Sequence, residues 1–292
     1  MHNKYKIKQH TKVHLQQLET KGSHHFFSNE KEAKHILEED ITKIQKLQQK
    51  LYAGKEKALL IIFQGIDTAG KDSCIKHIFS GVNPQGCTVT SFKQPSTTEL
   101  EHDFMWRHYT ALPAKGYISI FNRSYYENML VTRVHPDLLL KEKLQGIVKS
   151  SDAGNEFWQQ RCIIINNFEQ QLAESGTTIL KFFLHISKHE QKNRLLQRIQ
   201  EKDKNWKFEY GDLAERKLWK HYQQSYEDVL SHTSSHYAHW YVIPADEKWF
   251  SRVVISRIVA HVLGKMSLQF PEVTQLQKEQ LLQAEEELTN EN

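Results

Sequence analysis

Cysteine is scarce in this sequence, and no metal or disulfide framework is built from it. The 292 residues include three cysteines, Cys74, Cys87 and Cys162, an odd number without metal-ligand spacing. The 17 histidines are scattered, and none belongs to an HExxH pattern or a Cys/His cluster. These absences argue against a zinc module and a disulfide-stapled secreted domain. They fit reduced thiols in a cytoplasmic protein.

Long apolar runs and a strong charge imbalance are missing as well. Apolar runs such as ALLIIF at 58–63 are far shorter than the roughly 20 residues of a membrane helix. The opening MHNKYKIKQH has no apolar run, so we expect no signal peptide and no membrane contact. A net charge of +4 does not indicate a nucleic-acid binder, and any basic surface must therefore be local.

Strand and helix patterns alternate through the middle of the chain. Helical apolar spacing begins at 29–53, and short apolar runs predict strands at 58–63, 87–92, 116–121, 177–187 and 239–246. Further helices are predicted at 71–79, 98–112, 122–136 (helix or turn), 156–176, both ends of 188–222, and 248–265. This order predicts an α/β fold with a doubly wound parallel five-stranded sheet. Residues 1–30 are expected to form an extended arm, 31–265 one domain, and 266–292 an acidic tail.

The stretch GIDTAGK, at 65–71, has the spacing of a phosphate-binding loop. It lies between a predicted buried strand and a helix, which is the context such a loop requires. Backbone N–H groups of such a loop converge on phosphate oxygens, and the helix N-terminus adds positive potential. The alternative is a glycine turn that only tightens a strand–helix joint. The predicted phosphate-binding residues of the loop are Gly65, Ala69, Gly70, Lys71, Asp72 and Ser73.

Two carboxylates distinguish this loop from the usual pattern. Asp67 lies inside it, and Asp72 replaces the Ser or Thr that normally follows the lysine. Carboxylates beside phosphates repel them unless a cation intervenes, and Mg²⁺ prefers carboxylate and phosphate oxygens. We therefore predict Mg²⁺, with Mn²⁺ as the alternative, and interpret Asp67 as the metal organiser or the base that activates the acceptor. Asp72 is either a water-mediated metal ligand or a favourable first-turn acid of its helix.

A second charged motif follows the third predicted strand. The stretch FNRSYYENMLVTRVHP carries Asn122, Arg123, Glu127 and Arg133, at the sheet edge where ligands bind in open α/β folds. Many phosphate-loop enzymes have an aspartate at the strand end, whereas Asn122 is neutral. Two arginines and a carboxylate here fit phosphate and metal binding better than packing.

Three stretches together closely resemble the polyphosphate kinase 2 family. They are GIDTAGKDSCIKHIFSGVNPQGCTVTSFKQPSTTELEHDFMWR, LPAKGYISIFNRSYYENMLVTRVHP and YVIPADEKWFSR. The similarity runs from about residue 30 to about residue 265. No single motif is specific, but their combination is, and FNRSYYE is similar to the subgroup that accepts both AMP and ADP.

The resemblance implies a P-loop kinase fold similar to thymidylate kinase. It also implies Mg²⁺-dependent, reversible phosphoryl transfer between inorganic polyphosphate and purine nucleotides: AMP, ADP and ATP, with GMP and GDP as further candidates. It implies a homo-oligomer, a dimer or a tetramer, and 31–265 becomes a phosphotransferase domain with a lid at about 188–222. The catalytic residues carried over by the motifs are Asp67, Lys71, Arg123 and Glu127.

Asn122 departs from the aspartate of the wider family, so a direct metal bond from this position is doubtful. Asp67 and Glu127 are then the expected metal ligands, and Asn122 is at most a weak one. A polyanion also needs a basic channel, and Arg194 and Arg198, four residues apart, share one face of the predicted lid helix. The further candidates for lining that channel are Lys76, Lys93 and Arg133, and those for contacting the nucleotide are Arg107, Tyr126 and, weakly, Asn122.

Other interpretations of these residues remain open beside the family resemblance. The lid stretch can be a solvated charged helix, and the aromatic residues can be core. An ATP-dependent nucleoside monophosphate kinase would share the loop and the lid. A non-catalytic module that binds polyphosphate or nucleotide would also share the basic residues.

Overall fold

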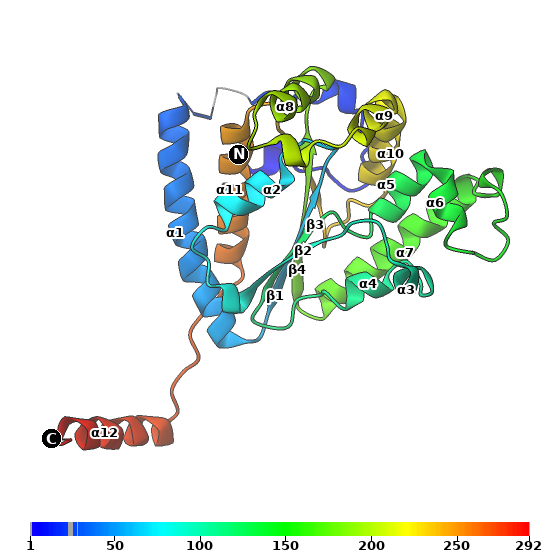
Figure 1. Cartoon of the computed structure of the whole chain (residues 1–292). Helices are drawn as coiled ribbons and strands as arrows, with labels where there is room; N and C mark the ends of the chain where they lie inside the picture. The colour runs from blue at the N-terminus through cyan, green and yellow to red at the C-terminus, as the bar shows by residue number, and fades with distance from the viewer. Residues whose placement is uncertain (1, 23–25, 28, 292) are drawn as a thin grey trace.

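The computed structural model describes residues 2–22, 26–27 and 29–291, and these residues form one sheet of five parallel strands. The sheet order is β2-β3-β1-β4-β5 (Figure 1). This confirms the predicted doubly wound parallel sheet, with each strand displaced by only a few residues. The strands are β1 (Ala58–Gln64), β2 (Cys87–Ser91), β3 (Ile118–Asn122), β4 (Thr177–His185) and β5 (Trp240–Pro244).

Helices cover both faces of the sheet, which is why the central strand is apolar from Ala58 to Phe63. Every residue of β1 is buried, and its side chains alternate between two cores. Leu59 and Ile61 join the core of one face, and Leu60 and Ile62 join the core of the other. One face is covered by α1 (Glu30–Gly54), α2 (Lys71–Ile78) and α11 (Lys248–Lys265), and the other by α5 (Glu127–Val134), α7 (Asn155–Glu174) and α10 (Trp219–His232) (Figure 1).

Shorter helices fill the connections. The single helix predicted at 98–112 is wrong, because the chain forms two short helices there with a turn between them. The side chain of Asp103 accepts a hydrogen bond from the Met105 backbone N–H at 2.8 Å and starts the second turn. The remaining α-helices are α3 (Thr97–Leu100), α4 (Trp106–Tyr109), α6 (Pro136–Leu140), α8 (Lys188–Gln200), α9 (Gly211–Lys217) and α12 (Gln275–Thr289). The 3₁₀ turns are η1 (His2–Lys4), η2 (Leu15–Gln17), η3 (Pro84–Gly86), η4 (Ser150–Asp152) and η5 (Asn205–Lys207).

The N-terminal arm packs onto the domain. Backbone hydrogen bonds join Ile7 N–H to the carbonyl of Trp240 at 2.8 Å and Val242 N–H to the carbonyl of Tyr5 at 2.9 Å, so this segment runs antiparallel along β5. The arm also buries apolar side chains against the cores, namely Tyr5, Val13, Leu15 and Phe27. Residues 1, 23–25 and 28 of the predicted arm lie outside the described residues.

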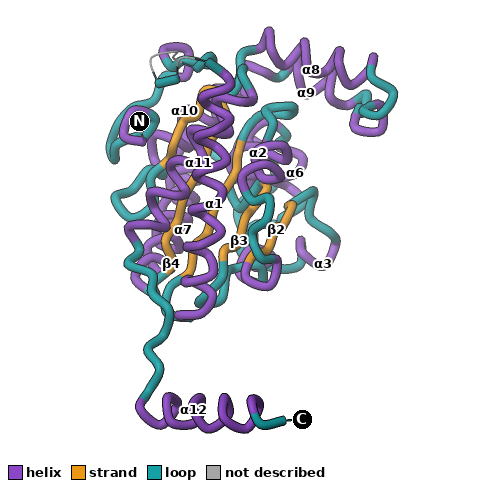
Figure 2. The backbone as a smooth tube through the Cα atoms, turned by 90° about the vertical axis from the view of Figure 1, so that its left-hand side faces the viewer, coloured by secondary structure: helices purple, strands orange, loops and turns teal. Residues whose placement is uncertain are grey.

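The C-terminal tail extends away from the domain (Figure 2). It contains α12, whose residues are all exposed, after a largely exposed segment that follows Met266. Residue 292 lies outside the described part of the tail. Across the described residues, no helix combines the length and apolarity that crossing a bilayer requires.

Candidate active site

The predicted phosphate loop lies at the carboxyl end of β1, where the winding of the sheet reverses. After β1 the chain enters α2 on one face, and after the neighbouring β3 it enters α5 on the opposite face (Figure 1). Ligands of open α/β folds bind in the crevice between two such strands. The sheet therefore brings the loop and the FNRSYYE motif together.

Both glycines of the loop are required by its backbone. A Cβ on Gly65 would lie 2.9 Å from the Cβ of Ala69 and 3.1 Å from the carbonyl oxygen of Leu184. Gly70 has a φ of +102°, a conformation that other residues rarely adopt. The loop thus turns tightly before α2 and directs the helix N-terminus toward the crevice.

Lys71 is buried beneath the loop. Its Nζ donates a hydrogen bond to the carbonyl of Gly65 at 2.6 Å, and the residue is 7% exposed. Burial lowers the pKa of Lys71, and the Arg123 guanidinium adds to this, while the nearby carboxylates oppose it. The ammonium is therefore held in a poorly solvated position, where its interaction with an anion is strengthened.

Arg123 joins the second motif to the loop. Its Nη2 donates to Oδ1 of Asp67 at 2.8 Å, and its backbone N–H donates to the carbonyl of Phe63 at 3.0 Å. Its φ of +65° is strained for a residue with a side chain. The turn after β3 thus adopts an unfavourable conformation that places a guanidinium against the loop carboxylate.

Glu127, the first residue of α5, completes this charged group. Burial raises the pKa of Glu127, and Arg123 and Lys71 counteract the rise. Burial also disfavours the charge of Arg123, but Glu127 and Asp67 outweigh it and raise the pKa of Arg123. Two cations and two carboxylates from the two motifs therefore interact with one another in the crevice.

The neutral Asn122 contacts the second loop carboxylate. Its Nδ2 donates to Oδ1 of Asp72 at 2.7 Å, which leaves Asp72 exposed but oriented. The neighbouring Ser73 accepts a hydrogen bond from Nη2 of Arg252 at 2.6 Å. The first turn of α2 is thereby fixed from two sides.

The oxygen atoms of this crevice fit a divalent cation whose remaining ligands would come from substrate and water. The structure buries Oδ1 of Asn122 and Oε1 of Gln64 without a hydrogen-bond partner among the described residues. Within those residues no three His, Cys, Asp or Glu side chains form a ready-made metal cage. Mg²⁺ typically takes one or two carboxylates together with substrate phosphates and water. Asp67 and Glu127 are the carboxylates that would hold it.

Helix α8, in the stretch predicted to form a lid, contacts the loop through Arg194. Its guanidinium donates to the carbonyls of Thr68 and Ala69, each at 2.9 Å, and also to the carbonyls of Ala245 and Asp246. Arg194 is only 5% exposed, so it supports the loop from behind. Its predicted contact with polyphosphate stays a prediction, and any such contact would require these bonds to rearrange.

Other residues of the predicted lid stretch contact the loop or the neighbouring helix α9. Arg198 is paired with Asp212 of α9 at 3.3 Å. Gln191 donates to the backbone carbonyl of Asp67 at 3.3 Å and accepts from Arg216 at 2.8 Å. The lid therefore contacts the same loop residue that Arg123 binds.

The hydrogen bonds described above do not include four of the predicted binding residues. Lys76 and Lys93 are exposed. Arg107 donates to the Lys93 carbonyl at 2.9 Å, and Arg133 is paired with Asp228. The roles of these side chains in lining a channel or contacting a nucleotide stay predictions.

Tyr126 was predicted to contact the nucleotide, but the structure places it elsewhere. Its side chain is fully buried in the second core, where its hydroxyl donates to Glu169 at 2.8 Å. A base could reach the ring only if the core opened. The helical position just before Glu127 turns this side chain away from the crevice.

The sequence did not single out three polar residues that contact the site. Gln64 donates to Ser124 at 3.1 Å behind the motif, Gln191 contacts the loop, and Arg252 holds Ser73. Gln64 carried a signal, since it is a polar residue at the end of a fully apolar strand. Arg252 ends the YVIPADEKWFSR stretch, which was singled out as a whole and not for this residue. Gln191 carried no signal, because polar residues are ordinary on helices.

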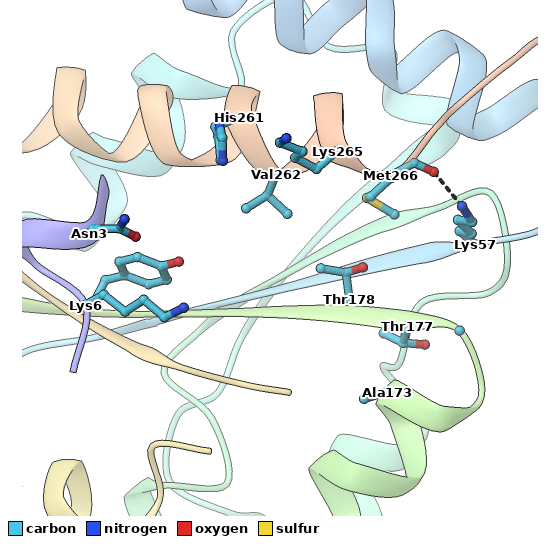
Figure 3. A pocket seen from close by; sticks show the side chains of 12 residues that line it. Asn3, Lys6, Lys57, Ala173, Thr177, Thr178, His261, Val262, Lys265 and Met266 are labelled. Carbon is cyan, nitrogen blue, oxygen red and sulfur yellow. Dashed lines mark hydrogen bonds between the residues drawn. The ribbon is translucent and has the colours of Figure 1, made fainter. Parts of the chain in front are cut away.

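A cavity of about 490 Å³ lies at the amino end of β4, whereas the candidate site lies at the carboxyl ends of the strands (Figure 3). It is lined by Thr177, Thr178, Lys6, Lys265 and Met266, among others, and contains no predicted site residue. Lys57 on its rim donates to the carbonyl of Met266. The candidate active site is therefore defined by charge and backbone geometry, and not by this cavity.

Comparison with known proteins identifies the family to which most of the chain is similar. A family model described as polyphosphate kinase 2 matches residues 27–271. The ADP-polyphosphate phosphotransferase of Rhodopseudomonas palustris is 46% identical over 263 residues, which cover 90% of this chain and 90% of that protein. The AMP/ADP-polyphosphate phosphotransferase of Meiothermus ruber is 39% identical over 269 residues, covering 92% and 95%. A crystal structure of polyphosphate kinase 2 from Arthrobacter aurescens TC1 superimposes with a TM-score of 0.86 at 34% identity, covering 96% of this chain and 95% of that one.

Proposed function

Because this chain belongs to the polyphosphate kinase 2 family, we propose that it transfers phosphoryl groups between inorganic polyphosphate and nucleotides. AMP is converted to ADP and ADP to ATP, reversibly, and guanine nucleotides are further candidate acceptors. The relatives named for ADP and for AMP/ADP support both acceptor classes. The observation that carries the proposal is the contact of Arg123 with Asp67 above the buried Lys71.

The proposed reaction is an in-line displacement. An oxygen of the acceptor phosphate forms a bond to the terminal phosphorus of polyphosphate, while the bond from that phosphorus to its bridging oxygen breaks. The acceptor phosphate is already ionised at pH 7, so no strong base is needed. Positioning and charge neutralisation then account for most of the rate.

The charged residues of the crevice divide this work between them. Lys71 and Arg123 stabilise charge on the transferring group, Lys71 from a buried position and Arg123 from a half-exposed one. Loop N–H groups at the start of α2 bind phosphate oxygens. Asp67 and Glu127 would hold the divalent cation, Mg²⁺ in this proposal, which would neutralise phosphate charge during transfer.

A product profile tests the proposal directly. The protein is incubated with long-chain polyphosphate and Mg²⁺, without ATP, and with AMP, ADP, GMP or GDP in turn. We expect ADP and ATP from the adenine nucleotides, no product without polyphosphate, and loss of product in EDTA. Asp67→Asn is expected to lose at least about 10²-fold in rate.

The two alternatives predict other outcomes. An ATP-dependent monophosphate kinase would phosphorylate AMP with ATP and give no product from polyphosphate. A binding module would retain polyphosphate or nucleotide in a binding assay, and no combination of donor and acceptor would turn over. Either result would overturn the proposed function.

A further inference from the structure

A buried polar cluster lies behind the candidate site, and the function proposed above gives it no role. Tyr125 and Tyr126 donate hydrogen bonds to the same oxygen, Oε1 of Glu169, at 2.7 and 2.8 Å. Nζ of Lys181 donates to Oε2 of Glu169 at 2.6 Å and to the carbonyl of Thr233, also at 2.6 Å. All five residues have an exposed fraction of 0%. Glu169 therefore accepts three hydrogen bonds in a position that solvent does not reach.

The cluster connects four elements of the second core. Glu169 comes from α7, Lys181 from β4, and Thr233 directly follows α10. The indole N–H of Trp240, on β5, donates to Oγ1 of Thr233 at 2.9 Å. The tyrosines are thus attached to a support that neighbouring elements hold in place.

Stability alone does not account for such a cluster. Burial lowers the pKa of Lys181, which Glu169 counteracts, so taking this ion pair out of water is costly. Replacing a buried ion pair with apolar residues of similar volume is often neutral or stabilising. What a fully satisfied buried network does provide is a fixed orientation of its members.

The orientation matters because of what the tyrosines adjoin. They lie in the turn between the strained Arg123 and Glu127, and Tyr126 directly precedes α5. From the other side the turn is held by Ser124, whose Oγ accepts from Nε2 of Gln64 at 3.1 Å and from the Tyr126 N–H at 3.3 Å. The turn is therefore fixed from β1 through Ser124 and from α7 through Glu169.

We propose that Glu169, acting through the two tyrosine hydroxyls, is a positioning residue for Glu127. The hydroxyl bonds fix the rotation of the turn and so direct the first side chain of α5 into the crevice, next to Lys71 and Asp67. The proposal rests on the proposed function, in which Glu127 acts in phosphoryl transfer.

A double-mutant cycle tests it. The variant Tyr125→Phe/Tyr126→Phe keeps both rings in the core and removes both hydroxyls. In the wild-type background we expect kcat to fall about tenfold, with KM for ADP changed less than about twofold, since a misplaced catalytic group costs rate. In the Glu127→Gln background the same change is expected to lower kcat by less than about twofold, because the group that is positioned is no longer a carboxylate.

Thermal unfolding separates a loss of stability from a loss of positioning. Loss of the hydroxyls is expected to lower the unfolding temperature equally in both backgrounds. Tyr237→Phe is the matched control, since its hydroxyl donates to the Asn166 carbonyl of α7 at 2.9 Å, outside the cluster. It should leave kcat unchanged. If the kcat losses of the tyrosine and Glu127 changes multiply in full, the tyrosines only stabilise the fold and the proposal is overturned.

A crystal structure of the double variant gives a readout that needs no turnover. Displacement of the Glu127 side chain relative to Lys71 supports positioning, and an unmoved Glu127 overturns it. If wild type shows no polyphosphate-dependent turnover, the proposed function fails by itself and this comparison still decides the positioning. If the double variant does not fold, the single Tyr126→Phe change is carried through the same cycle and crystal structure.

Discussion

At the scale of single residues, Lys71 combines burial with a contact to the loop it serves. Lys71→Ala removes the ammonium from beneath Gly65, and we expect kcat to fall at least about 10²-fold because a preorganised cation is lost from a poorly solvated site. Steady-state rates with polyphosphate and ADP measure this. Lys46→Ala, which changes an exposed lysine of α1, is the matched control and should keep full activity. A rate for Lys71→Ala within about threefold of wild type would contradict the assignment.

His108 is expected to make stability depend on pH. Burial lowers its pKa to about 3, with Arg107 adding to the effect, and both ring nitrogens are buried without partners among the described residues. The unfolded chain takes up a proton below about pH 6.5, whereas the folded chain does not, so stability is lost as pH falls from about 6.5 toward 3. This residue alone should cost about 2 kcal/mol at pH 5 relative to pH 8.

Urea unfolding of wild type and His108→Phe at these two pH values measures the effect. Phenylalanine suits a site where the ring lies 4.2 Å from Phe92, centroid to centroid. The variant should lose about 2 kcal/mol less between pH 8 and pH 5. Exposed His10, changed to Ala, should behave as wild type. Equal losses in wild type and His108→Phe would show that His108 is protonated when folded.

At the scale of elements, the interaction of α8 with the loop rests on Arg194. Arg194→Met leaves four carbonyls without their donor, and we expect a loss of about 3 kcal/mol in unfolding free energy. The amides of 66–70 should also exchange with deuterium about tenfold faster or more, because the loop loses its support. Arg198→Met removes a more exposed arginine of the same helix and should change neither quantity by as much. Unchanged exchange of the loop amides in Arg194→Met would show that the loop keeps its conformation without Arg194.

Elements were predictable where burial left a simple pattern. The run 58–63 read as a strand buried on both faces, and β1 is one. The prediction of one helix at 98–112 was wrong. The hydrogen bond that the Asp103 side chain accepts from the Met105 N–H sets where the second helix starts, and apolar spacing does not reveal such a bond. The candidate site was likewise predictable only where local spacing defines it. Gly65 and Lys71 are readable from spacing, whereas the inward turn of Tyr126 depends on Glu169, far away in the sequence.

At the scale of the whole molecule, we predict that the C-terminal tail adds little to the stability of the rest of the chain. Every described residue after Gln269 is exposed, and the family match ends at 271. A chain ending at Pro271 should therefore unfold within about 2 °C of the full chain and keep its turnover rate, since it loses no buried contact. Calorimetry and the ADP assay measure both. A drop of more than about 5 °C would instead mean that α12 packs on another copy of the chain.

The backbone pairing of Tyr5 and Ile7 with β5 protects the molecule from edge-to-edge association with other copies. Without these residues, β5 would be the open border of the sheet, offering unused N–H and C=O groups to any extended segment nearby. The N-terminal segment thus covers β5, the edge strand of the sheet. Because Tyr5 and Ile7 precede β5 in the chain, they are already available to pair with it when that strand joins the sheet.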